Sequence, residues 1–405
     1  MTARVVLGVG GGIAAYKAAE LLRLFTESGH RVRVIPTASA LRFVGAPTWA
    51  ALSREPVADD VWADAHEVPH VRLGKEADLV VVAPATADLI AKAAHGLADD
   101  LLTNTLLTAR CPVVLAPAMH TEMWEHPATQ ANVALLRSRG VLVIEPASGR
   151  LTGADTGKGR LPDPAEIFAF ARRVLARGGS GPTDLAGRHV VVTAGGTREP
   201  LDPVRFLGNR SSGKQGYAFA RTAAARGARV TLVSANPTLP PPAGVDLVVV
   251  GTNEELRKAT VEAAADADAV VMAAAPADFR PAVYASEKIK KVPGEGPAPI
   301  ALALNPDIAA ELGERKAAGQ VLVVFAAETV STEAALANAR QKLVVKKADL
   351  IVVNQVGTDK VFGSDANTAT VLGADGSETV FPPQPKEDLA DAVWDLVTTR
   401  LTSTS

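Results

Sequence analysis

Short runs of apolar, mostly β-branched residues alternate along this chain with longer segments whose apolar residues recur every three or four positions. The first pattern is typical of strands buried on both faces, and the second of amphipathic helices. In the first half, the pattern predicts strands at 4–9, 31–35, 78–83, 112–116 and 141–144, and helices at 13–28, 86–95, 127–139 and 164–176. This alternation predicts a doubly wound parallel sheet with helices on both faces.

The same alternation begins again at residue 188. Strands are expected at 188–193, 229–233, 246–250, 268–274, 321–325 and 349–353, with a hairpin at 368–380 and a closing helix at 386–401. The glycine- and proline-containing segments 194–211 and 276–300 are predicted to be long and irregular, and such segments tend to be functional. We therefore predict two α/β domains of the Rossmann-like type, 1–176 and 188–405, joined by a glycine-rich linker at 177–187.

Composition agrees with two globular domains. The chain has 405 residues, which is enough for two hydrophobic cores, and 47% of them are hydrophobic. A formal net charge of -2 gives no electrostatic reason to expect nucleic acid or membrane partners. The single cysteine, Cys111, excludes a disulfide framework and is expected to be a packed thiol. With no signal peptide or long apolar stretch in the sequence, we expect a cytoplasmic protein that binds small molecules.

The first candidate site is a glycine turn, Gly10-Gly11-Gly12, between the first strand and a helix that begins near Ile13. Unblocked N–H groups and the positive end of a helix dipole suit a phosphate group there, although glycines also serve tight turns without any ligand. A dinucleotide-binding fold normally has an acidic residue after its second strand. Here Thr37 and Ser39 take that place, which disfavours NAD and favours a cofactor with a single phosphate.

Four segments in order resemble the flavin-dependent cysteine decarboxylases, which have a flavodoxin-like fold. They are Gly11-Gly-Ile-Ala-Ala-Tyr-Lys17, Pro84-Ala-Thr-Ala-Asp88, Gly96-Leu-Ala-Asp-Asp-Leu-Leu-Thr103 and Pro117-Ala-Met119, within a resemblance that spans residues 4–175. The family's glycine-rich substrate clamp is also present, at 151–160. The resemblance implies FMN-dependent decarboxylation of 4′-phosphopantothenoylcysteine to 4′-phosphopantetheine. It implies that His70 is the active-site histidine, and that FMN is held by Gly10, Gly11, Gly12, Ile13, Thr37, Ser39 and Thr86.

This sequence departs from that family at two places. Many relatives have asparagine after Pro-Ala-Met, where it contacts the substrate carboxylate, and this chain has His120. The family's substrate clamp usually contains a cysteine that acts as a proton donor, and Gly153 stands at its position. Thr152 and Asp155 remain as alternative donors, as does a water molecule.

The second candidate site combines Asn209-Arg-Ser-Ser212-Gly213-Lys214 with lysines further along the chain. Lys288, Lys290 and Lys291 lie in an irregular segment, and Lys342 and Lys346 are spaced to share one face of a helix. Hydroxyls, glycines and several lysines together can surround a triphosphate. The alternatives from the residues alone are an ordinary capped helix and a solvated charged surface.

From residue 187 onward, the chain resembles the phosphopantothenate-cysteine ligase domain. The matching motifs are the Asn209 segment, Ala277-Asp278-Phe, Glu287-Lys-Ile-Lys-Lys, Asn305-Pro-Asp-Ile308 and Phe325-Ala-Ala-Glu-Thr. The resemblance implies CTP as the nucleotide and Asn209 as the residue that stabilises the acyl-nucleotide. The implied substrate-binding residues are Ser212, Gly213, Met272, Ala273, Ala274, Asp278, Lys288, Asn305, Pro306, Asp307, Ile308, Phe325, Lys342 and Lys346.

Together the two resemblances predict a bifunctional enzyme of coenzyme A biosynthesis, because the ligase product is the decarboxylase substrate. It would ligate 4′-phosphopantothenate and cysteine through an acyl-CMP intermediate, with Mg²⁺ bound to CTP and no metal ligands identified in the sequence. The resemblance implies homo-oligomers built from decarboxylase trimers and ligase dimers, such as a dodecamer. The alternatives are a flavoprotein regulator with a non-catalytic decarboxylase fold and a dehydrogenase with two nicotinamide-binding units.

Overall fold

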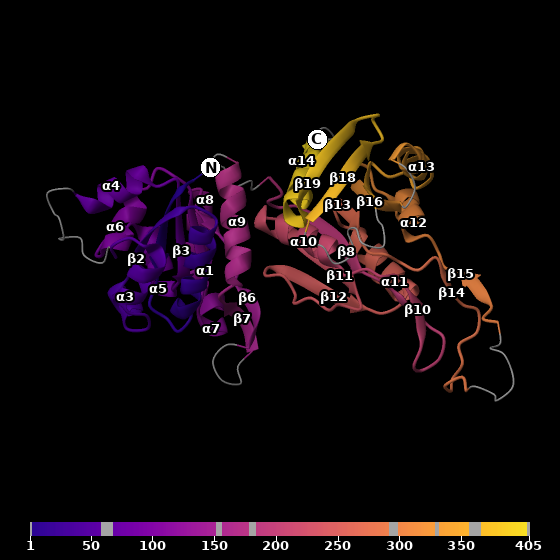
Figure 1. Cartoon of the computed structure of the whole chain (residues 1–405), viewed down its shortest axis with the longest axis horizontal. Coiled ribbons are helices and arrows are strands. Elements are labelled where there is room, and N and C mark those ends of the chain that lie inside the picture. Colours follow the sequence, from indigo (N-terminus) through magenta and orange to yellow (C-terminus); the bar gives the residue numbers. More distant parts are fainter. Residues whose placement is uncertain are drawn as a thin grey trace. The chain divides into compact units, whose positions relative to one another are not determined.

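The computed structural model describes residues 2–57, 68–150, 156–177, 184–290, 299–328, 332–355 and 366–402. The chain divides into two compact units, Met1–Pro182 and Thr183–Ser405 (Figure 1). Each has its own sheet and its own hydrophobic core. No helix in the described ranges is both long and apolar enough to span a lipid bilayer.

The N-terminal unit is built on a five-stranded parallel sheet of order β2-β1-β3-β4-β5. This is the strand order of flavodoxin-like folds, so the predicted fold class is confirmed for this unit. The strands are β1 (Arg4–Val9), β2 (Arg31–Pro36), β3 (Leu79–Ala85), β4 (Val113–Pro117) and β5 (Leu142–Val143). A separate antiparallel hairpin pairs β6 (Ala147–Arg150) with β7 (Thr156–Arg160).

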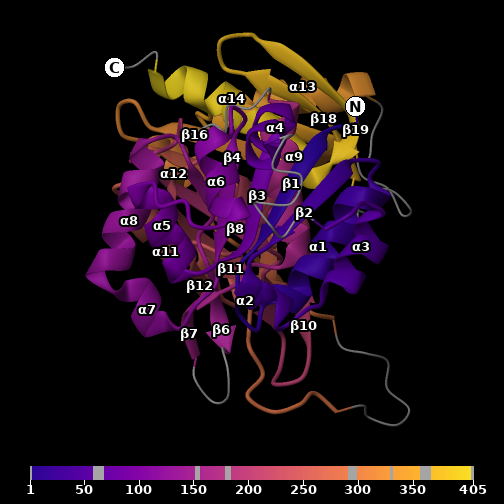
Figure 2. The same ribbon diagram turned by 90° about the vertical axis from the view of Figure 1, so that its left-hand side faces the viewer.

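Helices cover both faces of this sheet (Figure 2). Val6, Val80 and Val82 point to the face where Leu89 and Val133 are buried, because successive strand residues alternate between faces. The helices of the unit are α1 (Ala15–Glu27), α2 (Ala38–Leu41), α3 (Ala46–Ser53), α4 (Pro69–Glu76), α5 (Ala87–His95), α6 (Leu101–Thr108), α7 (Thr121–Glu125), α8 (Pro127–Ser138) and α9 (Pro164–Ala176).

The C-terminal unit has an eight-stranded sheet of order β12-β11-β8-β13-β16-β17-β18-β19. Its first six strands are parallel, and the predicted hairpin adds two antiparallel strands at one edge. The strands are β8 (His189–Gly195), β11 (Arg229–Ala235), β12 (Val245–Val250), β13 (Ala269–Met272), β16 (Val321–Glu328), β17 (Leu350–Gln355), β18 (Ala366–Gly373) and β19 (Glu378–Pro385). The order of the six parallel strands is that of a Rossmann fold, which confirms the prediction for this unit.

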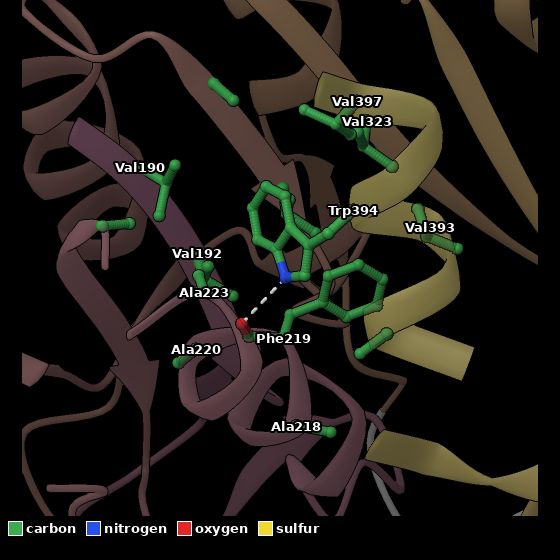
Figure 3. Packing of buried hydrophobic residues seen from close by; sticks show 14 of the residues in the cluster. Val190, Val192, Ala218, Phe219, Ala220, Ala223, Val323, Val393, Trp394 and Val397 are labelled. Atoms are coloured by element: carbon green, nitrogen blue, oxygen red, sulfur yellow. Dashed lines mark hydrogen bonds between the residues drawn. The ribbon is translucent and has the colours of Figure 1, made fainter. Parts of the chain in front are cut away.

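Two cores lie on opposite faces of the second sheet. Val190 and Val192 pack toward α10 (Lys214–Ala225) and α14 (Lys386–Thr402), whereas Val191 packs toward the other helices. Those helices are α11 (Asn253–Ala264), α12 (Ile308–Arg315) and α13 (Thr332–Val345). Figure 3 shows Trp394 of α14 at the centre of the first core, where its indole N–H donates to the Phe219 carbonyl oxygen at 3.1 Å.

The two segments predicted to be irregular contain short strands. Within 194–211, β9 (Arg198–Pro200) and β10 (Phe206–Gly208) form an antiparallel hairpin, so a wholly irregular segment was a wrong prediction. After residue 276, β14 (Phe279–Pro281) pairs with β15 (Leu302–Leu304). Three-residue strands that pair only with each other give no run of apolar residues long enough to recognise.

Truncation of Trp394 tests the packing of the second unit. Its side chain is fully buried, and we expect Trp394→Ala to lower the free energy of unfolding of this unit by about 3–5 kcal/mol. Chemical denaturation of the full chain, followed by circular dichroism, measures the shift of the corresponding transition. Val380→Ala removes a side chain that is 66% exposed and should change stability by less than about 0.5 kcal/mol. Equal effects of both variants would contradict this packing.

Candidate functional sites

The glycine turn after β1 lies against the ends of two neighbouring strands. The Gly10 N–H donates to the Pro84 carbonyl oxygen at 3.0 Å, and a Cβ at this position would overlap the same oxygen. A Cβ at Gly11 would overlap the side chain of Ser39. Only glycine therefore permits this close approach between the β1 turn and the segments that follow β2 and β3.

A cavity of about 1190 Å³ opens beside this turn. Most of the residues predicted for the flavin site line it, including His120 from the segment after β4. Gly10 does not line the cavity. Its backbone hydrogen bond to Pro84 holds the turn against the end of β3. The predicted lining residues are Gly11, Gly12, Ile13, Thr37, Ser39, Thr86 and His120.

Two of the predicted hydroxyls also begin helices. The Thr37 side chain accepts a hydrogen bond from the Ala40 N–H at 3.1 Å, and Thr86 accepts one from Leu89 at 3.3 Å. These N-caps direct the amino ends of α2 and α5 toward the carboxyl edge of the sheet, where an anion is favourable. Figure 2 shows α2, α7 and the β6–β7 hairpin at this same end of the unit.

The β6–β7 hairpin closes one side of the cavity. The Met119 N–H donates to the Gly159 carbonyl oxygen at 2.9 Å, which joins the hairpin to the turn that carries His120. The next residue of the hairpin, Arg160, lines the cavity. Thr152, Gly153 and Asp155, the residues of the clamp prediction, lie outside the described residues.

Charged side chains occupy two parts of the cavity wall. In one part, the Lys92 ammonium is 3.3 Å from a carboxylate oxygen of Asp88 and 3.0 Å from one of Asp99. In the other part lie Lys17 and Arg160. Partial burial lowers the pKa of Lys17, and the positive charge of Arg160 lowers it further. One part of the wall is thus neutralised by its own carboxylates, and the other contains two cations that repel each other.

His70 lies on α4, away from the residues that line the cavity of its own chain. Its backbone carbonyl oxygen accepts a hydrogen bond from the Thr108 hydroxyl at 2.7 Å, which ties the start of α4 to the end of α6. The ring Nδ1 is buried and has no hydrogen-bond partner among the described residues. The expectation that His70 acts at the flavin remains a prediction.

In the C-terminal unit, the candidate residues meet between the carboxyl ends of β8 and β13. The chain leaves β8 for β11 on one side and later returns to β13 on the other, which makes this the topological switch point. Gly195 at the end of β8 has a φ of +80°, and a Cβ there would overlap the Ala235 carbonyl oxygen. Ligands of open α/β sheets bind in such crevices.

Two threonines hold the loop after β13 in place. The Thr193 hydroxyl accepts a hydrogen bond from the Ala274 N–H at 3.0 Å, and the Thr197 hydroxyl accepts one from Ala277 at 2.8 Å. Asn209, which follows β10, contacts the same loop, because its Nδ2 donates to the Pro276 carbonyl oxygen at 3.0 Å. Its amide oxygen accepts no hydrogen bond within the described part of the chain and is available to a ligand.

A second set of contacts brings the Asn305–Ile308 turn to this loop. Asn305 Nδ2 donates to the Ala277 carbonyl oxygen at 2.8 Å, and the Asn305 N–H donates to that of Asp278 at 2.9 Å. Asp307 caps α12 and accepts a bond from the Lys346 ammonium at 3.2 Å. Asn209, Asn305 and Lys346 are therefore connected through one network of short contacts.

The other predicted residues of this unit differ in exposure. Met272 is buried, with its sulfur 3.7 Å from the Thr193 hydroxyl, and the half-buried Phe325 ring packs edge-on against Phe219. Lys288 is exposed, and Lys291 lies outside the described residues. The remaining predicted residues are Ser212 and Gly213 at the start of α10, Ala273 in the loop after β13, Pro306 and Ile308 in the turn before α12, and Lys342 on α13.

The lysine-bearing segment 285–290 is attached by Asp202. The Asp202 carboxylate accepts hydrogen bonds from the Ile289 N–H at 3.2 Å and the Arg205 guanidinium at 2.9 Å, and Arg205 donates to the Ile289 carbonyl oxygen at 2.7 Å. Burial would raise the pKa of Asp202, but these and two neighbouring backbone hydrogen bonds hold it well below its usual range. The attachment is therefore fully charged at neutral pH and weakens only in strong acid.

Several residues of both sites were missed from the sequence. Lys17 and Arg160 lie within the motifs of the first half, but no motif predicts a role for either side chain, and none predicts a role for Thr193, Thr197 or Asp202. Thr193 and Thr197 flank a glycine pair at the end of a strand. Their position could have indicated hydroxyls that hydrogen-bond to a neighbouring loop. Nothing in the sequence indicates that Lys17 and Arg160, which are far apart along the chain, share one cavity wall.

Two family models match the chain. Residues 1–176 match the model described as "Flavoprotein", and residues 185–401 match the "DNA/pantothenate metabolism flavoprotein C-terminal domain". The "Coenzyme A biosynthesis bifunctional protein CoaBC" of Mycobacterium tuberculosis is 57% identical over 409 aligned positions, which cover 99% of this chain and 98% of that protein. The chain belongs to this bifunctional coenzyme A biosynthesis family. The family membership predicted from the motifs is confirmed.

A more distant relative and two solved structures are also similar to this chain. The protein of the same name from Bacillus subtilis is 43% identical over 95% of this chain and 94% of its own. A crystal structure of the C-terminal domain of a CoaBC protein is 34% identical, covers 55% of this chain and 99% of that one, and has a TM-score of 0.46. A structure titled as a PPC decarboxylase mutant is 31% identical, covers 44% and 100%, and has a TM-score of 0.40.

Replacing Asp202 tests how the lysine segment is held. Asp202→Asn keeps the side-chain shape but removes the charge-assisted hydrogen bonds, each worth about 1.5–3 kcal/mol. We expect trypsin to cleave after Lys288 or Lys290 at least about tenfold faster in the folded protein, because cleavage requires local opening. Asp246→Asn, which changes an exposed carboxylate on β12, is the matched control. An unchanged cleavage rate in Asp202→Asn would show that other contacts hold the segment.

Proposed function

We propose that this chain carries out two consecutive steps of coenzyme A biosynthesis. The C-terminal site ligates 4′-phosphopantothenate and L-cysteine with CTP, and the N-terminal site decarboxylates the resulting 4′-phosphopantothenoylcysteine to 4′-phosphopantetheine. The observation that carries this proposal is the presence on one chain of two unlike sites, each at the carboxyl edge of its own sheet. The name of the full-length relatives supports it.

The N-terminal cavity suits FMN. The turn at Gly11 excludes side chains and presents backbone N–H groups, and the caps Thr37 and Thr86 begin helices at the same edge. Ser39 stands where a dinucleotide fold would have its ribose-binding acid, so a flavin with one phosphate fits better than NAD. When bound, FMN would supply the two-electron oxidation of the substrate thiol that makes decarboxylation possible, and would return the electrons afterwards.

The side chains around this cavity have roles that follow from their chemistry. His120 lines the cavity and can donate a hydrogen bond to the substrate carboxylate. We assign His70 Nε2 as the general base that removes a substrate proton. Because His70 is remote from the cavity of its own chain, it would act at the cavity of a neighbouring subunit. Apolar side chains at the cavity, Ile13 at 65% and Tyr16 at 60% exposure, are suited to such a contact.

The C-terminal site suits activation of a carboxylate. A carboxylate is a poor acyl donor, so it attacks the α-phosphate of CTP, forms acyl-CMP and releases pyrophosphate. The amine of cysteine then attacks the acyl carbon and displaces CMP. Asn209 can hold the acyl-nucleotide by accepting, with its amide oxygen, a hydrogen bond from a hydroxyl or N–H group of that intermediate. Lys288 and Lys346 neutralise charge that develops on the phosphates. Mg²⁺ would enter bound to the phosphates of CTP and neutralise part of their charge.

The same proposal includes a homo-oligomer of decarboxylase trimers and ligase dimers, such as a dodecamer, in the cytoplasm. A regulator that had lost catalysis would not need the connected network around Asn209. A nicotinamide dehydrogenase is disfavoured by the residue after β11, where Asn236 donates to the Gly196 and Gly251 carbonyl oxygens at 3.0 Å and 2.8 Å. That side chain ties two loops together and offers no carboxylate to a ribose.

The sequence of reactions is tested by following the intermediates. Wild-type protein incubated with phosphopantothenate, CTP, Mg²⁺ and cysteine should form 4′-phosphopantetheine, detected by mass spectrometry. His70→Asn should accumulate 4′-phosphopantothenoylcysteine without carbon dioxide release, and Asn209→Asp should form at least about 100-fold less amide product. The two variants serve as controls for each other. Failure of the wild-type protein to form the amide would refute the ligase assignment.

The flavin assignment is tested by cofactor content. Purified protein should be yellow and contain about one FMN per chain by absorbance. Gly11→Val should retain at least about tenfold less, because its side chain would collide with Ser39 and change the turn. Gly45→Ala is the matched control, since Gly45 has an ordinary φ of -70° and room for a Cβ. Colourless wild-type protein that also fails to bind added FMN would overturn the assignment.

A further inference from the structure

We infer that Lys17 and Arg160 form a second anion subsite in the N-terminal cavity, which holds the terminal phosphate of the decarboxylase substrate. This inference rests on the proposed function and deepens it, because neither residue was given a role in the reaction. The cations come from elements far apart along the chain, the first turn of α1 and the end of β7. Both line the cavity described above.

The size of the cavity leaves room for two ligands. Sites that enclose one drug-sized molecule have volumes of about 300–1,000 Å³. At about 1190 Å³, the cavity exceeds this range. FMN placed with its phosphate at the Gly10–Gly12 turn therefore leaves volume for a substrate that has a phosphate of its own.

Lys17 and Arg160 differ from the third cation of the cavity wall, Lys92, in having no carboxylate partner among the described residues. Lys92 is neutralised by Asp88 and Asp99, and Asp100 lines the same region. Lys17 and Arg160, in contrast, have no carboxylate within ion-pair distance among the described residues. Asp163 and Glu20 act on Lys17 only as more distant charges, and they lie outside the cavity lining. A bound anion would relieve the repulsion between the two cations.

The anion that fits is a phosphate ester and not the carboxylate that leaves as carbon dioxide. Decarboxylation removes the negative charge of that carboxylate, so strong cations beside it would stabilise the ground state more than the transition state. The phosphate does not react, and its binding energy can position the remote thiol and carboxylate. His120, on the turn that the hairpin contacts, then faces the other end of the substrate, which carries the reacting carboxylate.

Binding of the reaction product with and without its phosphate tests the subsite. Isothermal titration calorimetry of the flavin-loaded protein should show that 4′-phosphopantetheine binds the wild-type protein about 10- to 100-fold more tightly than pantetheine, since charge-assisted hydrogen bonds are worth about 1.5–3 kcal/mol each. Lys17→Gln and Arg160→Gln should each remove at least about tenfold of this preference. Their affinity for pantetheine and their FMN content should stay at wild-type values.

The matched control is Lys158→Gln, the same change of charge on the same hairpin. Lys158 points to Glu145, with 2.7 Å between ammonium and carboxylate, and lies outside the cavity lining. The Lys158→Gln variant should prefer 4′-phosphopantetheine over pantetheine as strongly as the wild-type protein does.

Several outcomes would overturn the subsite. They are a wild-type protein without preference for the phosphorylated ligand, variants that lose affinity for both ligands equally, and variants that lose FMN while keeping the preference. The last outcome would assign the two cations to the flavin phosphate. Failure of the proposed function looks different, because the wild-type protein would then bind the phosphorylated product but release no carbon dioxide from 4′-phosphopantothenoylcysteine.

Discussion

Parallel strands impose the constraint on which both sites of this protein depend. Their carboxyl ends all lie at one edge of a sheet. The loops that follow two neighbouring strands therefore border one crevice where the chain continues to one side from the first strand and to the other side from the second. Convergence requires close backbone contact, and glycine makes it possible at Gly11 in the first unit and at Gly195 in the second. The helix amino ends at the same edge favour anions before any charged side chain contributes.

The two units use this constraint differently. In the first, the loops meet at the glycine turn and leave beside it a large cavity whose wall contains hydroxyls at the place of the usual ribose-binding acid. In the second, the loops are joined by Thr193, Thr197 and Asn305, which accept or donate short hydrogen bonds to the segment after β13. The first arrangement suits a resident cofactor and a second ligand, and the second suits a nucleotide held against an ordered loop.

The architecture could be predicted from the sequence because strands buried on both faces of a parallel sheet are runs of apolar, mostly β-branched residues. Such runs precede Gly10 and Gly195. It was insufficient where short strands pair only with each other, as in the β9–β10 hairpin, since three residues give no periodicity. For the sites, the residues beside the glycine turns could be predicted from position along the chain. The Lys17 and Arg160 pair could not, because it depends on packing between elements that are distant in sequence.

A phosphate at the far end of the proposed substrate gives a physical reason for the way the wall of the first unit's cavity is built. In the proposed reactions, the phosphate of 4′-phosphopantothenate takes no part in either step and is present in the ligase substrate, in the intermediate and in the final product. An interaction with a group that does not react can supply orientation at the reacting end, provided that the protein holds both ends rigidly. In the first unit, Arg160 is placed by the same hairpin that joins the His120 turn, through the contact between Met119 and Gly159. The proposed anchor for the phosphate and the histidine proposed to face the leaving carboxylate are thus parts of one connected piece of structure, so binding at one end would position the other.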